Sequence, residues 1–207
     1  MIVFVTRPDL SIIDAPISFS QERIDGTKAY IKEHYDLEVD TISIDPKMIV
    51  IHAMDDENLS QAFELFDQET IPSNWGQVTN AGTVNVSAHF LITRDGKVLR
   101  LMPETQMARH VIGLNYHAIG IENITGPNND KLTQKQLESN IRLVKYLKNK
   151  YKRIQYLIGH YEYTTFEDHP LWMEKNKNYR TKKSDPTVEF MDALHHNLHD
   201  FSIKRKP

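Results

Sequence analysis

Short apolar runs rich in β-branched residues most strongly limit how this 207-residue chain can fold. MIVIHAM at 48–54, HAIGIENIT at 117–125 and QYLIGH at 155–160 each read as a buried strand. VSAHFLIT and KVLRLM flank an Arg-Asp-Gly turn at 94–96 and read as a hairpin, because Asp-Gly supplies the positive φ angles of a tight turn. These runs are strand-sized and too short to span a membrane.

Four segments between and around these runs have helical patterns. Capping boxes are expected at Ser18/Gln21 and Thr133/Gln136, and Asp185 is expected to cap the last helix with Pro186 in its first turn. The second segment has an apolar stripe at Leu59, Ala62, Phe63 and Phe66. The expected helices lie within residues 18–35, 58–68, 133–151 and 185–201.

Strands mixed with helices, one hairpin and a helical crossover predict an α/β fold, with a single domain built on a central mixed β-sheet flanked by helices. Residues 1–17 are irregular and are expected to form an arm over the domain, so that 1–46 comprise an N-terminal arm and helix packed on residues 47–207.

Composition excludes several classes of function. The net charge of −3 and the pI near 6.4 provide no global basic field for nucleic-acid binding, and we expect no nucleic-acid partner. The chain has no cysteine, which rules out disulfides, thiolate metal sites and cysteine nucleophiles. We expect a soluble monomer with a solvated KRKP end, residues 204–207.

Three polar residues stand at strand ends or beyond them, where side chains can converge: His52, His160 and Asp185. Two neutral imidazoles and one carboxylate form a natural zinc set with a fourth position open for water. The alternative for each histidine is an ordinary core or surface position, and 107 residues between the first two leave their meeting open.

Two further charged residues are candidates for catalysis. Strand periodicity places Glu122 on one face with Ala118 and Gly120, where a carboxylate is costly to bury and small neighbours leave room for a ligand. In an extended segment Lys183 projects the same way as Asp185, so its ammonium would enter the same site, and Lys182 would point away. The alternatives are a glutamate that reaches water at the sheet edge and an ordinary surface lysine.

In combination the motifs are more specific than any one of them. The order IVIHAM, VSAHFLITRDGKVLRLMPETQMARHV, NYHAIGIENIT, LIGHYEY and KKSDPT resembles the type 2 family of zinc-dependent N-acetylmuramoyl-L-alanine amidases. This family also includes phage lysozyme-type amidases and peptidoglycan recognition proteins. The resemblance covers about residues 47–195 and implies that residues 47–207 form a zinc amidase catalytic domain.

The resemblance implies one Zn²⁺ held by His52, His160 and Asp185, with Glu122 as the acidic catalytic residue and Lys183 as the basic one. The implied reaction is hydrolysis of the amide between N-acetylmuramic acid and L-alanine, in peptidoglycan or its muropeptide fragments. Three residues match a loop that borders the groove in relatives and are expected to contact substrate: Arg109, His110 and Asn115.

The chain also departs from the family pattern. Ala88 replaces the tyrosine of phage-type members, so proton transfer would fall to Glu122, and His89 is expected to be structural or to lie behind the site. Thr187 replaces the glycine usual after Asp-Pro. Residues 161–182 form an added loop at the rim, and its His169 is not expected to bind metal.

Three readings of the function remain open. The first is a cell-wall amidase in the periplasm or envelope, with the cytoplasm and small anhydro-muropeptides as the alternative. The second is a non-catalytic peptidoglycan-binding protein, which the presence of all three ligands and both auxiliary residues disfavours. The third is a zinc amidase that acts on another acylated amine.

Overall fold

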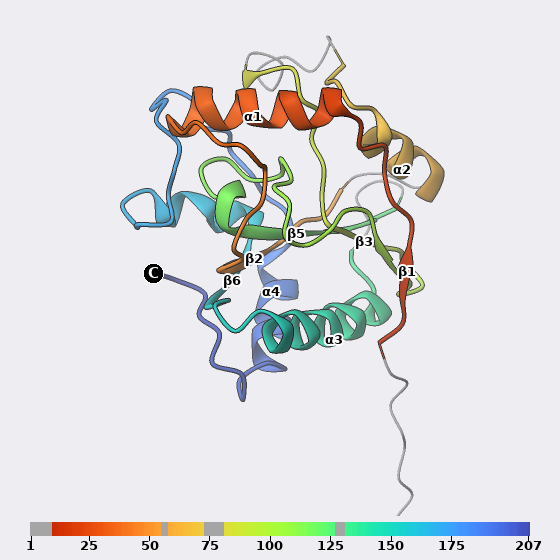
Figure 1. The fold of residues 1–207 in the computed structure, drawn as a ribbon. Coiled ribbons are helices and arrows are strands. Elements are labelled where there is room, and N and C mark those ends of the chain that lie inside the picture. The colour runs from red at the N-terminus through yellow and green to blue at the C-terminus, as the bar shows by residue number, and fades with distance from the viewer. Residues whose placement is uncertain (1–9, 55–57, 73–80, 127–130) are drawn as a thin grey trace, which may run out of the picture.

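Six strands among the described residues form one mixed sheet with the order β1-β4-β3-β5-β2-β6 (Figure 1). The computed structural model describes residues 10–54, 58–72, 81–126 and 131–207. The strands are β1 (Ile12–Asp14), β2 (Met48–Ile51), β3 (Phe90–Ile92), β4 (Val98–Arg100), β5 (Ala118–Asn123) and β6 (Tyr156–Gly159). The α/β fold with a mixed central sheet that the sequence predicts is confirmed.

The neighbouring strands β5, β2 and β6 are parallel, and the hairpin of β3 and β4 lies on the other side of β5. β2 pairs in parallel with both β5 and β6, whereas β3 and β4 pair antiparallel through the predicted turn. The parallel strands are buried on both faces, which explains their nearly continuous apolar sequences. Because they run in one direction, their carboxyl ends meet at one edge of the sheet.

Helices cover both faces of the sheet. α3 (Gln134–Lys150) and α4 (Val188–His196) pack on one face, and α1 (Gln21–Tyr35) and α2 (Leu59–Asp67) lie on the other side (Figure 1). On the α3 and α4 side, Ile49, Ile51 and Ile121 are fully buried against residues such as Leu143 and Leu194. Side chains at the alternate positions of these strands lie on the opposite face of the sheet and point towards the site described below.

Helix starts show where local prediction succeeds. The predicted capping box of α3 is present: Gln136 N–H donates to the Thr133 side chain, and the Thr133 N–H donates to the Gln136 side chain. The prediction for α1 is wrong by two residues, because Ser20 rather than Ser18 is its N-cap and accepts a hydrogen bond from Glu22 N–H. Ser18 instead donates its backbone N–H to Asp67.

Both ends of the described chain are more ordered than the sequence suggests. Part of the expected arm is β1, which pairs in parallel with β4. At the other end, Lys204 forms a parallel bridge with Tyr156, and the Arg205 side chain is only 25 % exposed. The expectation of a solvated KRKP end is therefore wrong for Arg205, whereas Lys204, Lys206 and Pro207 are exposed.

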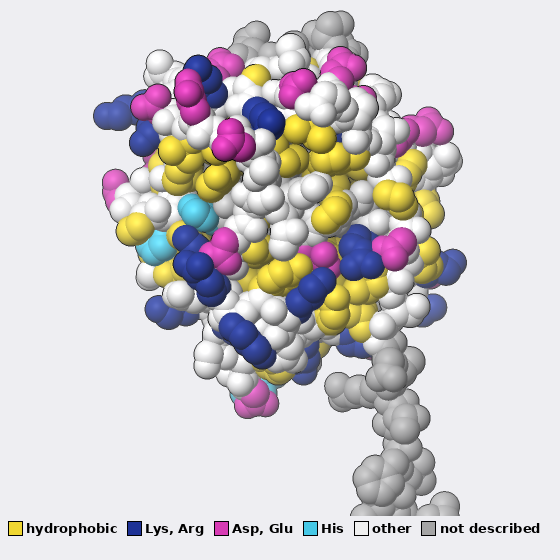
Figure 2. Space-filling view, in the orientation of Figure 1, with side chains coloured by type: hydrophobic (Ala, Val, Ile, Leu, Met, Phe, Trp, Pro, Cys, Tyr) yellow, Lys and Arg dark blue, Asp and Glu magenta, His cyan; other side chains and the backbone are white. Residues whose placement is uncertain are grey.

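Charged residues of both signs occur on the face shown in Figure 2, with hydrophobic side chains between them. Within the described ranges, no helix combines the length and the apolar character that crossing a membrane would require.

Candidate metal centre

The centre of the site is built by three neighbouring parallel strands that pair in register near their carboxyl ends. Ile51 of β2 is paired with Ile121 of β5 and with Gly159 of β6. The residue that follows is His52 after Ile51, Glu122 after Ile121 and His160 after Gly159. Sheet register therefore brings one histidine, one glutamate and a second histidine to the same edge, although they lie far apart in the sequence.

Asp185 reaches this edge from the segment that precedes α4. Its backbone carbonyl accepts a hydrogen bond from Tyr161 N–H at 3.0 Å, and its Oδ2 accepts one from Ala53 N–H at 3.4 Å. The prediction that Asp185 caps α4 is wrong, because Thr187 is the N-cap and accepts from Phe190 N–H. The carboxylate of Asp185 is therefore directed to the two histidines instead of to the helix end.

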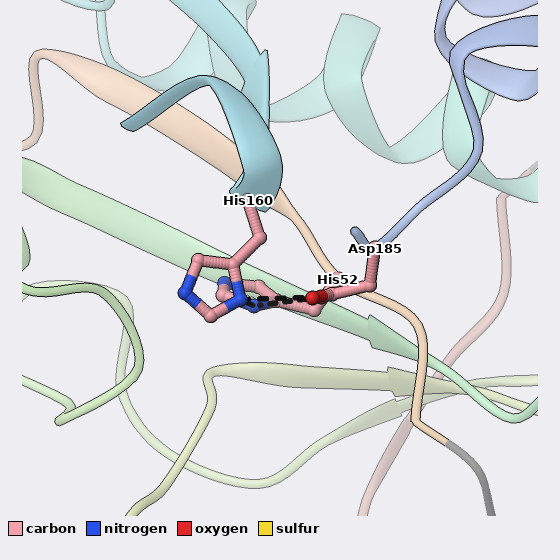
Figure 3. Close-up of side chains that lie close together, drawn as sticks. All are labelled: His52, His160 and Asp185. Atoms are coloured by element: carbon pink, nitrogen blue, oxygen red, sulfur yellow. Dashed lines mark hydrogen bonds and ion pairs between the residues drawn. The ribbon is translucent and has the colours of Figure 1, made fainter. Parts of the chain in front are cut away.

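The side chains of His52, His160 and Asp185 point towards one another (Figure 3). One ligand atom from each lies within 4.8 Å of the other two. Nδ1 of His52 is 2.9 Å from Nδ1 of His160, and Asp185 Oδ2 is 3.2 Å from His160 Nδ1 and 3.7 Å from His52 Nδ1. Two imidazole nitrogens and one carboxylate oxygen at these separations fit a tetrahedral Zn²⁺ site.

The environment of these groups keeps the donor atoms in the state that a metal needs. Burial, together with the neighbouring His52, lowers the pKa of His160 to about 4, so its ring is neutral at pH 7. Burial alone would raise the pKa of Asp185, but the hydrogen bond with His160 and the nearby ring of His52 hold this pKa well below the ordinary value. Asp185 is therefore a carboxylate.

His110 lies behind His52 and determines which ring nitrogen of His52 carries hydrogen. His110 Nε2 is 3.4 Å from the carbonyl oxygen of Ala118, which can only accept, so this nitrogen is the donor. His110 Nδ1 is then an acceptor, and it lies 2.9 Å from His52 Nε2. His52 therefore donates from Nε2 and presents the lone pair of Nδ1 to Asp185 and His160.

Glu122 lies beside the cluster with its side chain 14 % exposed. Its Oε1 is 3.9 Å from His52 Nδ1, and its buried Oε2 has no hydrogen-bond partner among the described residues. The pKa of Glu122 is raised to about 7, chiefly by burial and also by the charge of Asp185, while His52 and Lys183 oppose the shift. A carboxyl group with this pKa exchanges a proton readily near neutral pH.

Lys183 and Asp185 both line a cavity of about 250 Å³ at the strand ends, whereas Lys182 is exposed. This is the alternation expected of an extended segment. The same cavity is bordered by His52, Glu122 and His160, so the ammonium group belongs to the same site as the cluster.

One wall of the cavity is apolar and was not foreseen from the sequence. It consists of Met54, Leu65, Phe66 and Val86. Leu65 lies off the buried stripe of α2, which is why the helical pattern did not place it in the core. An apolar residue outside the stripe of an amphipathic helix was the signal that could have indicated this wall. Leu59, within the expected stripe, is 39 % exposed.

The three residues expected to contact substrate have different surroundings. Arg109 borders the cavity, donates from Nη1 to the carbonyl oxygens of Gly82 and Val84, and stacks 4.9 Å over the ring of Tyr30. Asn115 is fully buried, and its Oδ1 accepts the backbone N–H groups of His110 and Val111. Asn115 thus shapes the loop that carries His110, and contact with substrate stays a prediction for all three residues.

Two other histidines have structural contacts. His89 Nδ1 accepts from Gly120 N–H, and its Nε2 lies 2.8 Å from the carbonyl oxygen of Gln106, so it joins β5 to the chain after β4. His169 Nε2 lies 3.2 Å from the Tyr156 hydroxyl, and its Nδ1 accepts from Leu171 N–H. Among the described residues, His169 is not part of the cluster that could hold a metal.

Comparison with known proteins agrees with this architecture. A family model described as N-acetylmuramoyl-L-alanine amidase matches residues 43–187. Curated protein sequences give no match. Similar solved structures include N-acetylmuramoyl-L-alanine amidase LysC from Clostridium intestinale URNW, with 21% identity and a TM-score of 0.57 over 94% of this chain and 99% of that chain.

Two further solved structures have the same fold. The endolysin amidase LysCS from Clostridium intestinale URNW is 20% identical, with a TM-score of 0.56 over 95% of this chain and 99% of that chain. A selenomethionine derivative of AmpD is 20% identical, with a TM-score of 0.57 over 90% of this chain and 93% of that chain.

Proposed function

Because the chain belongs to the N-acetylmuramoyl-L-alanine amidase family, we propose that it is a zinc-dependent hydrolase that cleaves the amide between N-acetylmuramic acid and L-alanine. The substrate is peptidoglycan or its muropeptide fragments. The observation that carries this proposal is the convergence of His52, His160 and Asp185 beside a buried glutamate whose pKa is about 7.

His52 Nδ1, His160 Nδ1 and one oxygen of Asp185 would hold the ion. The fit rests on the donor set, on its separations and on the His52 tautomer that His110 selects. When bound, zinc would lower the pKa of a water molecule and polarise the substrate carbonyl.

Glu122 is the general base and then the general acid. It accepts a proton from the attacking water as the water oxygen adds to the amide carbon, and it returns that proton to nitrogen as the C–N bond breaks. The products are the carboxylic acid of the lactyl group and a peptide with a free amino group on L-alanine. The pKa of about 7 suits both transfers at neutral pH.

Lys183 stabilises the negative charge that develops on the carbonyl oxygen during the addition. Its side chain borders the cavity beside Asp185 and Glu122, and no hydrogen bond or ion pair with another described residue occupies its ammonium group. A cation held at the site of charge development favours the transition state over the ground state.

The test is release of peptides with amino-terminal L-alanine from purified muropeptides. We expect release that needs zinc and is lost in His52→Ala and Asp185→Ala. Glu122→Gln should bind zinc as the wild type does, and its turnover should fall by roughly 10²-fold or more. Tight muropeptide binding with no turnover in added zinc would instead establish a binding protein, and turnover of other acylated amines alone would establish a different amidase.

We propose that the protein acts in the periplasm or cell envelope, with the cytoplasm as the alternative. The support is α1 and the rim loop 161–182, which add surface beside the cavity. Turnover measured on whole sacculi and on small anhydro-muropeptides separates these cases, because an envelope enzyme should process sacculi and a cytoplasmic one only the small substrates.

A further inference from the structure

Arg205 binds three side chains around the beginning of the 3₁₀ helix η4 (His160–Phe166). Its Nε lies 2.6 Å from Glu162 Oε1, and its Nη1 lies 2.5 Å from Asp192 Oδ1. Its Nη2 donates to the hydroxyl of Tyr161. Glu162 and Tyr161 are the two residues that directly follow His160.

These contacts continue to the backbone around two residues of the metal centre. The second oxygen of Glu162, Oε2, accepts the N–H of Gly159 at 2.9 Å, so one carboxylate joins Arg205 to the residue before His160. The N–H of Tyr161 donates to the backbone carbonyl of Asp185 at 3.0 Å. The segment 159–162 therefore carries one expected ligand and is hydrogen-bonded to the backbone of another.

The position of Arg205 is itself set by pairing with β6. Lys204 N–H donates to the Gln155 carbonyl at 2.8 Å, and Leu157 N–H donates to the Lys204 carbonyl at 2.8 Å. The segment 203–205 thus lies along the strand that ends at Gly159. Because β6 places both Gly159 and Arg205, the guanidinium is held at a defined distance from the residues beside His160.

We propose that Arg205 is a positioning residue of the metal centre, acting through Glu162 and Tyr161 on the orientation of His160 and Asp185. This rests on the zinc site proposed above. Glu162 is a largely buried carboxylate with its side chain 10 % exposed, and charge-assisted hydrogen bonds to it are strong and directional. Loss of the guanidinium leaves Glu162 free to turn from Gly159, and the rigid turn that presents His160 is then lost.

The chain offers controls for each contact. Asp192→Asn removes the ion pair of Arg205 with α4 and leaves Glu162 and Tyr161 in place. Lys206→Ala removes a neighbouring exposed cation. Arg205→Lys keeps the charge but loses the fork that contacts several side chains at once.

The measurements are zinc affinity, by competition with a chromophoric chelator, and the visible spectrum of the Co²⁺-loaded protein, which reports ligand geometry. We expect Arg205→Gln and Glu162→Gln to weaken zinc binding about 10-fold and to change the Co²⁺ spectrum. Arg205→Lys should recover part of the affinity. Asp192→Asn and Lys206→Ala should match the wild type in both readouts.

If folded Arg205→Gln had the zinc affinity and the Co²⁺ spectrum of the wild type, the inference would be overturned, even if that variant melted at a lower temperature. The proposed zinc function would not be affected by this result. A wild-type chain that bound no metal would overturn both. Should Arg205→Gln fail to fold, Glu162→Gln carries the same test, because it removes the carboxylate charge and keeps the guanidinium.

Discussion

His52 Nε2 lies 2.9 Å from Nδ1 of His110, 58 positions along the chain, and this contact leaves Nδ1 of His52 as the lone pair that faces His160 and Asp185. The ring of His110 packs against Gly120, where an added Cβ would lie 2.8 Å from the ring atoms. The small residue on β5 thus makes room for the ring that orients the first histidine of the metal centre.

His110→Phe should therefore weaken zinc binding by about 10-fold to 100-fold, because it keeps a ring of similar size and removes the acceptor for His52 Nε2–H. Chelator competition measures the affinity. His196→Phe, at an exposed position, is the matched control and should not change it. Unchanged affinity in folded His110→Phe would show that the His52 tautomer does not depend on this contact.

Lys183→Ala should bind zinc as the wild type does, and its turnover should fall by roughly 10²-fold. The reason is that the cation acts on the developing oxyanion and not on the metal. Lys182→Ala, at the preceding and exposed position, should change neither zinc content nor turnover. Steady-state kinetics on muropeptides and zinc content measured on the same samples provide the comparison. Equal turnover of the two variants would remove Lys183 from the mechanism.

Zinc should raise the thermal stability of the wild type, since an ion that binds only the folded chain shifts the equilibrium by about 2.7 kcal/mol when its free concentration is 100 times Kd. Thermal unfolding with a chelator and with added zinc measures this shift. Asp185→Ala should abolish the shift by removing one ligand. A shift of the same size in Asp185→Ala would place the ion elsewhere.

His89 should make stability depend on pH in the acid range. Burial lowers the pKa of His89 to about 4 from the ordinary value of 6.5, so the unfolded chain binds a proton between these values and the folded chain does not. The contribution of His89 is therefore present above pH 6.5 and is lost as the pH falls towards 4, amounting to about 2 kcal/mol between pH 7 and pH 4.5.

Denaturant unfolding of the wild type and His89→Asn at those two pH values isolates this contribution, because asparagine does not titrate. The stability difference between the two proteins should shrink by about 2 kcal/mol at pH 4.5. A difference that stays constant with pH would mean that His89 is protonated in the folded protein.

Features set by neighbouring residues were predictable. The apolar runs predicted the parallel strands, and the Thr133/Gln136 box marked the start of α3 because both partners lie within one turn. Alternation along an extended segment separated Lys183 from Lys182 in the same way. Where several local caps compete, as at Ser18 and Ser20 or at Asp185 and Thr187, contacts with distant segments decided between them.

The strand faces, the α/β class and the chemistry of the candidate ligands could be read from the sequence, because these follow from side-chain type and from periods of two or 3.6 residues. Three further features depend on how the chain packs: the register in which β2, β5 and β6 pair, the orientation of His52 by His110, and the contact of Arg205 with the turn beside His160. The physical reason is that pairing of distant strands, and burial of polar groups against them, depends on contacts between segments far apart in the chain, which no local pattern encodes.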